Sequence, residues 1–144
     1  DTLTKSDKKF SRTNLGICED SFVFCCFSKS SKIQRPEFIL WMKLLLKIEN
    51  SCLWLLESNE ISKNNMLKEA NKMGVDTKRI IFTKKIPLRD HMSRQSCADL
   101  MLDTFNFSSG VMTSLALKSG LPILTLPGKT FSSRLSTSIL KNPL

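Results

Sequence analysis

The sequence contains no tyrosine and a single histidine, and it has five glycines and five prolines among 144 residues. So few glycines and prolines exclude collagen-like and low-complexity chains. Lys43 and Lys47 interrupt the most apolar stretch, at 38–48, which is therefore far shorter than the roughly 18 apolar residues of a membrane-spanning helix. The N-terminus has no charged start followed by an apolar core, so no signal peptide is predicted. Because the chain opens with Asp1, we expect it to be a piece of a longer protein.

Metal-binding spacing is also missing from the sequence. No pair of the five cysteines forms a C-x-x-C motif, His91 lies six residues before Cys97, and there is no Asp-x-Asp pair. Cys25, Cys26 and Cys52 lie inside apolar runs, where cysteine acts as a small buried hydrophobe. The sequence therefore predicts no metal site, and free thiols of this kind favour the cytoplasm.

Positive charge is in clear excess, since 22 Lys and Arg against 13 Asp and Glu give a formal net charge of +9. The basic residues are spread along the chain, and the aromatic residues are mostly Phe inside apolar runs. A nucleic-acid surface usually interleaves basic residues with exposed aromatic ones. A solvated basic surface is therefore the favoured interpretation, and a second one is that some cations face an anionic phosphate ligand. A basic α/β domain that binds nucleic acid stays as the weakest alternative.

The length predicts one domain, and the pattern of apolar runs predicts its elements. Short apolar runs indicate five strands, at 21–27, 51–56, 79–82, 100–103 and 123–126. Helical spacing indicates five helices, at 36–50, 62–73, 87–98, 110–119 and 130–140. Apolar strands that alternate with helices are typical of an α/β fold with a parallel sheet covered by helices on both faces.

Parallel sheets of this kind bind ligands beyond the carboxyl ends of their strands. The segment 103–110 follows the fourth strand, and Ser108, Ser109 and Gly110 would leave backbone N–H groups free for an anion at the next helix. The segment matches neither G-x-G-x-x-G nor the P-loop, which speaks against dinucleotide and ATPase functions. An ordinary turn and helix cap would have the same sequence.

Other candidate residues lie near the same sheet edge. Lys29 and Lys32 come just after the first strand and would reach this edge, or else lie in a solvated loop. His91 and Arg94 are one helical turn apart and share a face of the third helix. From the pattern alone, we expect that face to be polar and exposed.

Several blocks, in the same order, resemble the C-terminal catalytic lobe of the O-linked N-acetylglucosamine transferase family, also called the SPINDLY-like family. The resemblance covers the chain from about Arg12 to Leu140. The blocks that carry it are Leu15-Gly16, Glu19-Asp20, the strand at 22–27, Lys32-Ile33, the strand at 51–56, Arg79–Phe82, His91 with Arg94, the segment 98–105, Gly120–Pro122, Leu126–Gly128 and Thr130–Arg134.

This resemblance implies a metal-independent glycosyltransferase of the GT-B fold that moves N-acetylglucosamine from UDP-N-acetylglucosamine to Ser or Thr of acceptor proteins. Residues 1–20 would be a linker, and residues 21–144 a Rossmann-like UDP-sugar-binding lobe that is incomplete at its C-terminus. The N-terminal catalytic lobe and the tetratricopeptide region would belong to the parent protein. No cofactor, membrane or nucleic acid is expected.

The resemblance also assigns roles to individual residues. Lys32 matches the catalytic lysine that neutralises the diphosphate and aids departure of UDP. His91 matches a histidine that lies against the uracil ring, Arg94 an arginine that supports the nucleotide, and Ile86 a residue whose backbone meets the uracil edge. The UDP-binding positions implied in this way are Lys29, Ile86, His91, Arg94, Ser109, Gly110, Val111 and Met112.

Three positions depart from the family pattern. Val111 and Met112 stand where family members carry two threonines, and Leu115 stands where they carry an aspartate. Losing these hydrogen bonds would cost about 3–6 kcal/mol, or about two to four decades in affinity for the donor. The sequence therefore predicts weakened or no activity for this piece alone. A degenerate, non-catalytic lobe kept for protein interaction is the alternative.

Overall fold

A computed structural model describes residues 4–105, 110–125 and 135–141 of the chain. Its strands form one parallel sheet in the order β3-β2-β1-β4-β5. They are β1 (Phe22–Cys26), β2 (Ser51–Leu56), β3 (Ile80–Thr83), β4 (Leu100–Leu102) and β5 (Ile123–Leu124). The predicted α/β class and parallel sheet are therefore confirmed. Leu126, predicted as the end of the last strand, lies outside the described residues.

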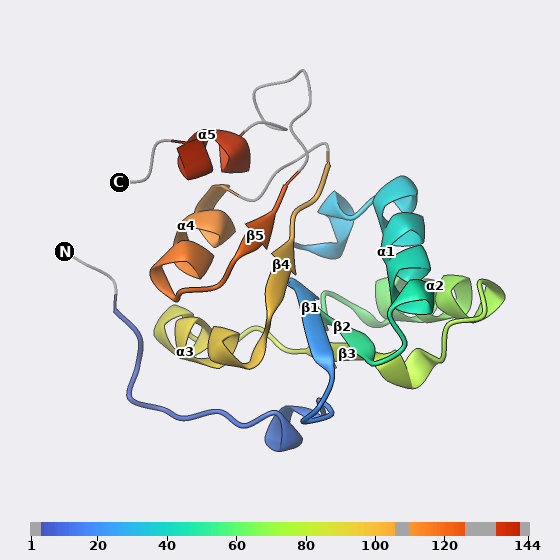
Figure 1. The fold of residues 1–144 in the computed structure, drawn as a ribbon, viewed down its shortest axis with the longest axis horizontal. Helices are drawn as coiled ribbons and strands as arrows, with labels where there is room; N and C mark the ends of the chain where they lie inside the picture. The colour runs from blue at the N-terminus through green and yellow to red at the C-terminus, as the bar shows by residue number, and fades with distance from the viewer. Residues whose placement is uncertain (1–3, 106–109, 126–134, 142–144) are drawn as a thin grey trace.

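Helices cover both faces of the sheet (Figure 1). They are α1 (Arg35–Lys47), α2 (Glu60–Lys72), α3 (Leu88–Arg94), α4 (Gly110–Lys118) and α5 (Leu135–Lys141). In Figure 1, α1 and α2 lie on one side of the sheet, and α3, α4 and α5 lie on the other. The helix predicted at 87–98 is shorter than expected, because a 3-10 turn at Gln95–Cys97 follows α3. The part of the last predicted helix before Leu135 lies outside the described residues.

The core has two layers because successive residues of each strand point to opposite faces of the sheet. Phe24, Cys26, Leu53 and Leu55 pack against α1 and α2. The alternate residues pack on the opposite face: Val23, Cys25, Cys52 and Trp54. All of these side chains are buried, as the apolar runs predicted for strands covered on both faces.

Glycines end two of the helices where the sequence predicted stops. Gly74 follows α2 with φ +82°, and Gly120 follows α4 with φ +79°. Both lie in the left-handed region that side chains with a Cβ rarely adopt, so glycine suits these turns.

The segment before β1 packs against the rest of the domain. Arg12 forms an ion pair with Asp99 at 3.0 Å and also donates to the carbonyl of Cys97 at 3.1 Å. Ile17 is buried beside the same core layer as β1. Nearer the N-terminus, the amide of Ser6 donates to the carbonyl of Arg89 at 3.2 Å, so this segment also contacts α3.

Strands β2 and β3 extend the sheet on one side of β1, and β4 and β5 extend it on the other. β1 and β4 are therefore neighbours, although three helices and two strands separate them in sequence. This is the switch point at which open α/β sheets place their ligands, outside the carboxyl ends of the strands. Among the described helices, none is long and apolar enough to cross a membrane.

Candidate functional site

The carboxyl edge of the sheet gathers most of the residues that the sequence singled out. Lys29 and Lys32 follow β1, where Lys29 precedes a short 3-10 turn at Ser30–Lys32 and Lys32 ends it, and both side chains are exposed. Ile86 is half-buried in the connection between β3 and α3. Gly110 is the first residue of α4, which follows β4. Because β1 and β4 are neighbours, the two lysines and the start of α4 follow adjacent strands.

His91 and Arg94 are buried, so the expectation of an exposed polar face on this helix was wrong. His91 is 4% exposed and Arg94 is 2% exposed. The His91 ring meets the Phe27 ring edge-on at 4.6 Å, and the Arg94 guanidinium lies 5.7 Å from the same ring. Phe27 is the first residue after β1, so this contact fixes α3 beside the carboxyl end of that strand. This face of α3 is buried because the apolar ring at the end of β1 packs against it, although the residues of the helix are polar.

Arg94 is a buried cation held by neutral acceptors. Its Nη1 donates to Thr83 Oγ1 at 3.1 Å and to the carbonyl of Lys84 at 2.9 Å, which joins α3 to the end of β3. Burial lowers the pKa of the Arg94 guanidinium below its ordinary value, although an arginine stays charged at neutral pH. Within 4–105, 110–125 and 135–141, no carboxylate forms an ion pair with it. In these ranges its charge is therefore met only by neutral acceptors.

The protonation state of His91 follows from its neighbours. Nε of Arg94 can only donate, so Nδ1 of His91 accepts this 2.9 Å hydrogen bond and carries no proton. Burial and the positive charge of Arg94 lower the pKa of His91 to about 4. The ring is therefore neutral at physiological pH, with its proton on Nε2.

Gln95 completes this cluster on the other side of the ring. Its side-chain amide nitrogen lies 3.3 Å from Nε2 of His91, and its buried amide oxygen has no partner within the described part of the chain. Since Nε2 carries the proton, it can donate only to the oxygen of this amide, and the amide nitrogen then takes the buried position without a partner. Sequence reasoning missed Gln95, although its spacing of four residues from His91 is the signal that pairs them.

The connection after β4 is tied down by two buried carboxylates. Asp103 accepts from the amide of Thr104 at 3.0 Å and from Thr125 Oγ1 at 2.7 Å, so it links the ends of β4 and β5. Glu37 accepts from the amide of Gln34 and from the amide of Phe105, both at 2.5 Å. Glu37 therefore joins the start of α1 to the connection that leads toward α4. The pairing of Gln34 with Glu37 is a capping spacing that the sequence contains, but the long-range bond to Phe105 has no local signal.

At the start of α4, the three residues that depart from the family pattern differ in their surroundings. Val111 is 73% exposed, Met112 packs against the core layer on the α4 side of the sheet, and Leu115 is 5% exposed. A carboxylate at Leu115 would be buried among apolar groups. Ser108 and Ser109, the other predicted anion-binding residues, lie outside the described residues. In the described ranges, no group of three or more His, Cys, Asp or Glu side chains is placed to hold a metal ion.

The fold points to a class of protein. The five-stranded parallel sheet with helices on both faces matches a lobe of a GT-B glycosyltransferase. A mutant of the O-GlcNAc transferase of Thermobaculum terrenum has the same fold, with a TM-score of 0.79 and 25% sequence identity, over 89% of this chain and 26% of that one.

Sequence comparison makes the assignment specific. The sequence model of glycosyl transferase family 41 matches residues 4–142. The chain is 31% identical over 134 residues to the probable UDP-N-acetylglucosamine–peptide N-acetylglucosaminyltransferase SEC of Arabidopsis thaliana, with 92% of this chain and 14% of the relative covered. It is 32% identical over 131 residues to the UDP-N-acetylglucosamine–peptide N-acetylglucosaminyltransferase of Caenorhabditis elegans, with 90% and 11% covered.

The chain belongs to glycosyl transferase family 41, and it corresponds to the C-terminal lobe of the O-GlcNAc transferases. It spans about one seventh or less of the length of these two relatives.

Proposed function

We propose that this chain is the donor-binding lobe of a protein O-glycosyltransferase that holds UDP-N-acetylglucosamine at the carboxyl edge of its sheet. The observation that carries the proposal is the positive charge at this edge. Arg94 is buried there without a carboxylate partner, and Lys29 and Lys32 form no ion pair within the described residues. A diphosphate would supply the missing negative charge.

Each candidate residue then has a physical role in donor binding. Glycosyl transfer builds negative charge on the departing UDP, and the ammonium of Lys32 would stabilise it, with Lys29 as a second cation. Backbone N–H groups at Gly110, Val111 and Met112 would add the positive end of α4. We propose that these groups neutralise the negative charge of the diphosphate without a metal cofactor.

The uracil would lie near the Phe27–His91–Arg94 cluster, where the backbone of Ile86 can contact its edge. His91 is neutral and its two nitrogens are directed at Arg94 and Gln95, so the ring has no free nitrogen for a hydrogen bond to the base. Ser109 is included in the proposed phosphate contact because of its sequence position alone.

The acceptor would be a Ser or Thr hydroxyl of a protein, and catalysis would need the N-terminal lobe and the tetratricopeptide region of a parent protein. We propose a cytoplasmic location on the ground that the five cysteines are free, four of them buried. With Val111, Met112 and Leu115 in place of two threonines and an aspartate, donor binding would be weak and this piece alone would not turn over.

A non-catalytic lobe is the second candidate, and the surroundings of Leu115 favour it. A buried leucine cannot hold a ribose hydroxyl, and no polar side chain replaces it at that position. Titration of UDP separates the two candidates, because a lobe kept only for packing or protein interaction has no need of the nucleotide.

The test is calorimetric titration of UDP, and of uridine, into the purified chain. Binding with a dissociation constant near about 1 mM is expected for UDP, with uridine weaker because it lacks the diphosphate. Lys32→Ala should weaken UDP binding about tenfold and leave uridine binding unchanged. Lys72→Ala, on the exposed face of α2, is the matched control and should leave both unchanged. A folded chain that binds no UDP at 10-fold higher concentration, about 10 mM, would support the non-catalytic lobe instead.

A further inference from the structure

Two serines fix the short turn that carries Lys32 to the start of α2. Ser30, the first residue of the turn, donates its amide to Ser58 Oγ at 3.0 Å, and its hydroxyl donates to Ser62 Oγ at 3.1 Å. The side chain of Lys29, which precedes the turn, makes no capping hydrogen bond to it. The side-chain support of this turn therefore comes from residues that lie 28 and 32 positions further along the chain.

The two serines are themselves held in place by neighbouring elements. Glu57, the residue before Ser58, donates its amide to the carbonyl of Thr83 at 2.8 Å, which continues the pairing of β2 with β3. At the start of α2, the side chain of Asn59 accepts from the amide of Ser62 at 2.8 Å and so caps the helix. Both acceptors for the turn therefore belong to ordered parts of the sheet edge.

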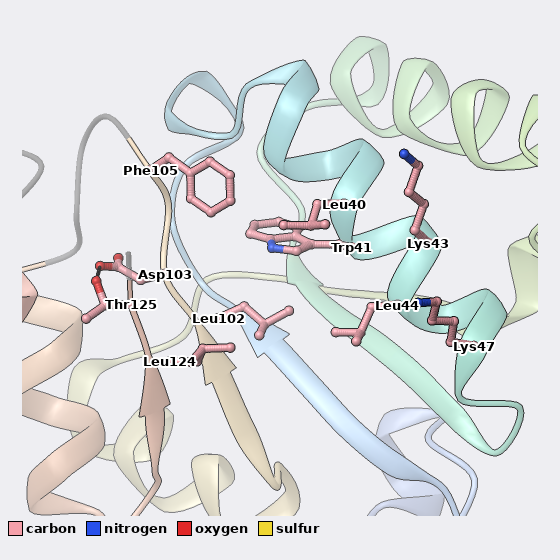
Figure 2. Close-up of a pocket in the computed structure, with 10 residues that line it drawn as sticks. All are labelled: Leu40, Trp41, Lys43, Leu44, Lys47, Leu102, Asp103, Phe105, Leu124 and Thr125. Atoms are coloured by element: carbon pink, nitrogen blue, oxygen red, sulfur yellow. Dashed lines mark hydrogen bonds between the residues drawn. The ribbon is translucent and has the colours of Figure 1, made fainter. Parts of the chain in front are cut away.

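The far end of the turn is also fixed, because it leads directly into α1. The amide of Ile33 donates to the carbonyl of Ser30 at 3.1 Å, and the Ile33 side chain packs against the core layer on the α1 side of the sheet. Figure 2 shows Trp41 of α1 and Phe105 of the connection after β4 lining the same pocket, so α1 contacts the neighbouring part of the sheet edge. Lys32 therefore lies between two anchored residues, Ser30 and Ile33.

An exposed lysine depends on its backbone for its position. Its stem is long and flexible, and its ammonium is a point charge without the planar geometry of a guanidinium. The ammonium must come within about 3 Å of the oxygen that gains charge, and a misplacement of about 1 Å is enough to weaken the interaction. Lys29 differs from Lys32, because it directly follows Ser28, which is buried at the end of β1.

We propose that Ser58 and Ser62 are positioning residues that hold the ammonium of Lys32 at the diphosphate of the donor. They act through Ser30 and the turn, rather than by contact with the nucleotide. When these bonds are lost, the turn moves, and the chain loses affinity for the diphosphate but not for uridine. This inference rests on the proposed function, because that function gives Lys32 its task at the diphosphate.

The experiment is an NMR titration of the whole chain with UDP and, separately, with uridine. Ser58→Ala should weaken UDP binding about threefold, and Ser58→Ala/Ser62→Ala about tenfold, which is close to the effect of Lys32→Ala. Uridine binding should stay unchanged, because uridine has no phosphate for Lys32 to contact. Ser58→Thr keeps the hydroxyl acceptor and should bind UDP as the unchanged chain does.

Ser11→Ala is the matched control for Ser58→Ala. Ser11 is exposed like Ser58, and its Oγ also accepts a backbone amide at a 3-10 turn, from Asn14 at 3.2 Å. That turn, at Thr13–Leu15, precedes β1 and so belongs to the opposite edge of the sheet. Ser11→Ala should lose a similar amount of stability in thermal unfolding and keep its affinity for UDP.

A double-mutant cycle separates positioning of Lys32 from a general loss of structure. In the Lys32→Ala chain, Ser58→Ala/Ser62→Ala should weaken UDP binding by less than about 1.5-fold further, because the group that the serines position is gone. A further loss as large as in the unchanged chain would overturn the proposal, and so would an equal loss of uridine affinity.

Failure of this inference is distinct from failure of the proposed function. If the folded, unchanged chain bound no UDP, the proposed function would fail and this inference would fail with it. If the unchanged chain bound UDP and the folded Ser58→Ala/Ser62→Ala variant bound it equally well, this inference alone would be overturned. Thermal unfolding shows whether each variant is folded.

Discussion

Nε of Arg94 donates a hydrogen bond to Nδ1 of His91 across 2.9 Å, one helical turn apart in α3, and both side chains are buried against Phe27. This bond places a fixed cation beside an imidazole. It therefore sets the tautomer of the ring and disfavours a second proton on it. A histidine with an ordinary pKa responds to pH near neutrality, whereas this one is kept neutral.

Because His91 is the only histidine in the sequence, its ring signals can be assigned without ambiguity. We predict that the ring does not titrate between pH 8 and about 5.5, since its pKa is lowered to about 4. Nitrogen-15 NMR of the imidazole should show the proton on Nε2 at pH 7. A titration midpoint near 6.5, or a proton on Nδ1, would show that the bond from Arg94 is not formed.

The lowered pKa of His91 also predicts a pH dependence of folding. In the unfolded chain His91 has its ordinary pKa of 6.5, so the unfolded chain takes up the proton first as the pH falls. The stability that depends on neutral His91 is complete above about pH 6.5 and falls by about 2–3 kcal/mol as the pH approaches 4. The measurement is urea unfolding of the wild type and of His91→Asn, which accepts from Arg94 but does not titrate.

The comparison of the two proteins isolates His91, because the opposite effects of Glu37 and Asp90 are common to both. Burial raises the pKa of Glu37, and hydrogen bonds from Ser6 and Lys8 lower the pKa of Asp90. The difference in unfolding free energy between wild type and His91→Asn should shift toward the variant below pH 6. Parallel pH profiles would contradict the prediction.

Arg94→Lys should destabilise the domain by about 2–4 kcal/mol, although it keeps the charge. A lysine cannot reach His91, Thr83 and the carbonyl of Lys84 at once, and of these acceptors His91 is buried and the other two lie in part-buried hydrogen bonds. Arg89→Lys, in the same helix but exposed, is the control and should cost less than about 1 kcal/mol. Equal losses for the two variants in urea unfolding would mean that the Arg94 network contributes nothing.

Glu37→Ala should cost about 2–4 kcal/mol, because it removes the acceptor of two part-buried hydrogen bonds, from the amides of Gln34 and Phe105. Glu37→Gln keeps one oxygen acceptor and should cost about half as much. Thermal unfolding compares the three proteins. If alanine and glutamine were equally mild, the link between α1 and the connection after β4 would carry no stability.

Restoring the family's threonines at α4 should strengthen UDP binding. Val111→Thr/Met112→Thr adds two hydroxyl donors at the helix start and should improve affinity about tenfold, measured by calorimetry. The equivalent change at position 115 is a poor test, because Leu115 is buried and a buried aspartate there would destabilise the packing of α4 on the sheet. A folded double variant with unchanged UDP affinity would mean that these positions do not face the phosphates.

The elements of the fold were predictable because their signals are local. The apolar run at Ser51–Leu56 gave the bounds of β2, and Gly74 and Gly120 marked the ends of α2 and α4. The order of the strands could not be read in the same way. It depends on which strands pair, and no short segment of sequence records that β1 lies beside β4.

The same distinction between local signals and long-range contacts applies to the candidate site. The positions of Lys29, Lys32 and Gly110 at one edge of the sheet follow from the parallel direction of the strands, whereas the adjacency of β1 and β4 depends on the strand order. The burial of His91 and Arg94 depends on Phe27 from another element, so the helical pattern alone predicted exposure wrongly. The bond of Glu37 to Phe105, 68 residues away, likewise has no signature in either segment.

The most direct test of donor binding at the carboxyl edge is amide NMR of the nitrogen-15-labelled chain during titration with UDP. We expect the shifts to concentrate after β1 at Lys29 and Lys32, around Ile86, and at the start of α4 near Gly110, with the His91 ring signals moving in parallel. Shifts confined to residues far from this edge, or no shifts from a folded chain at about 10 mM UDP, would contradict the account.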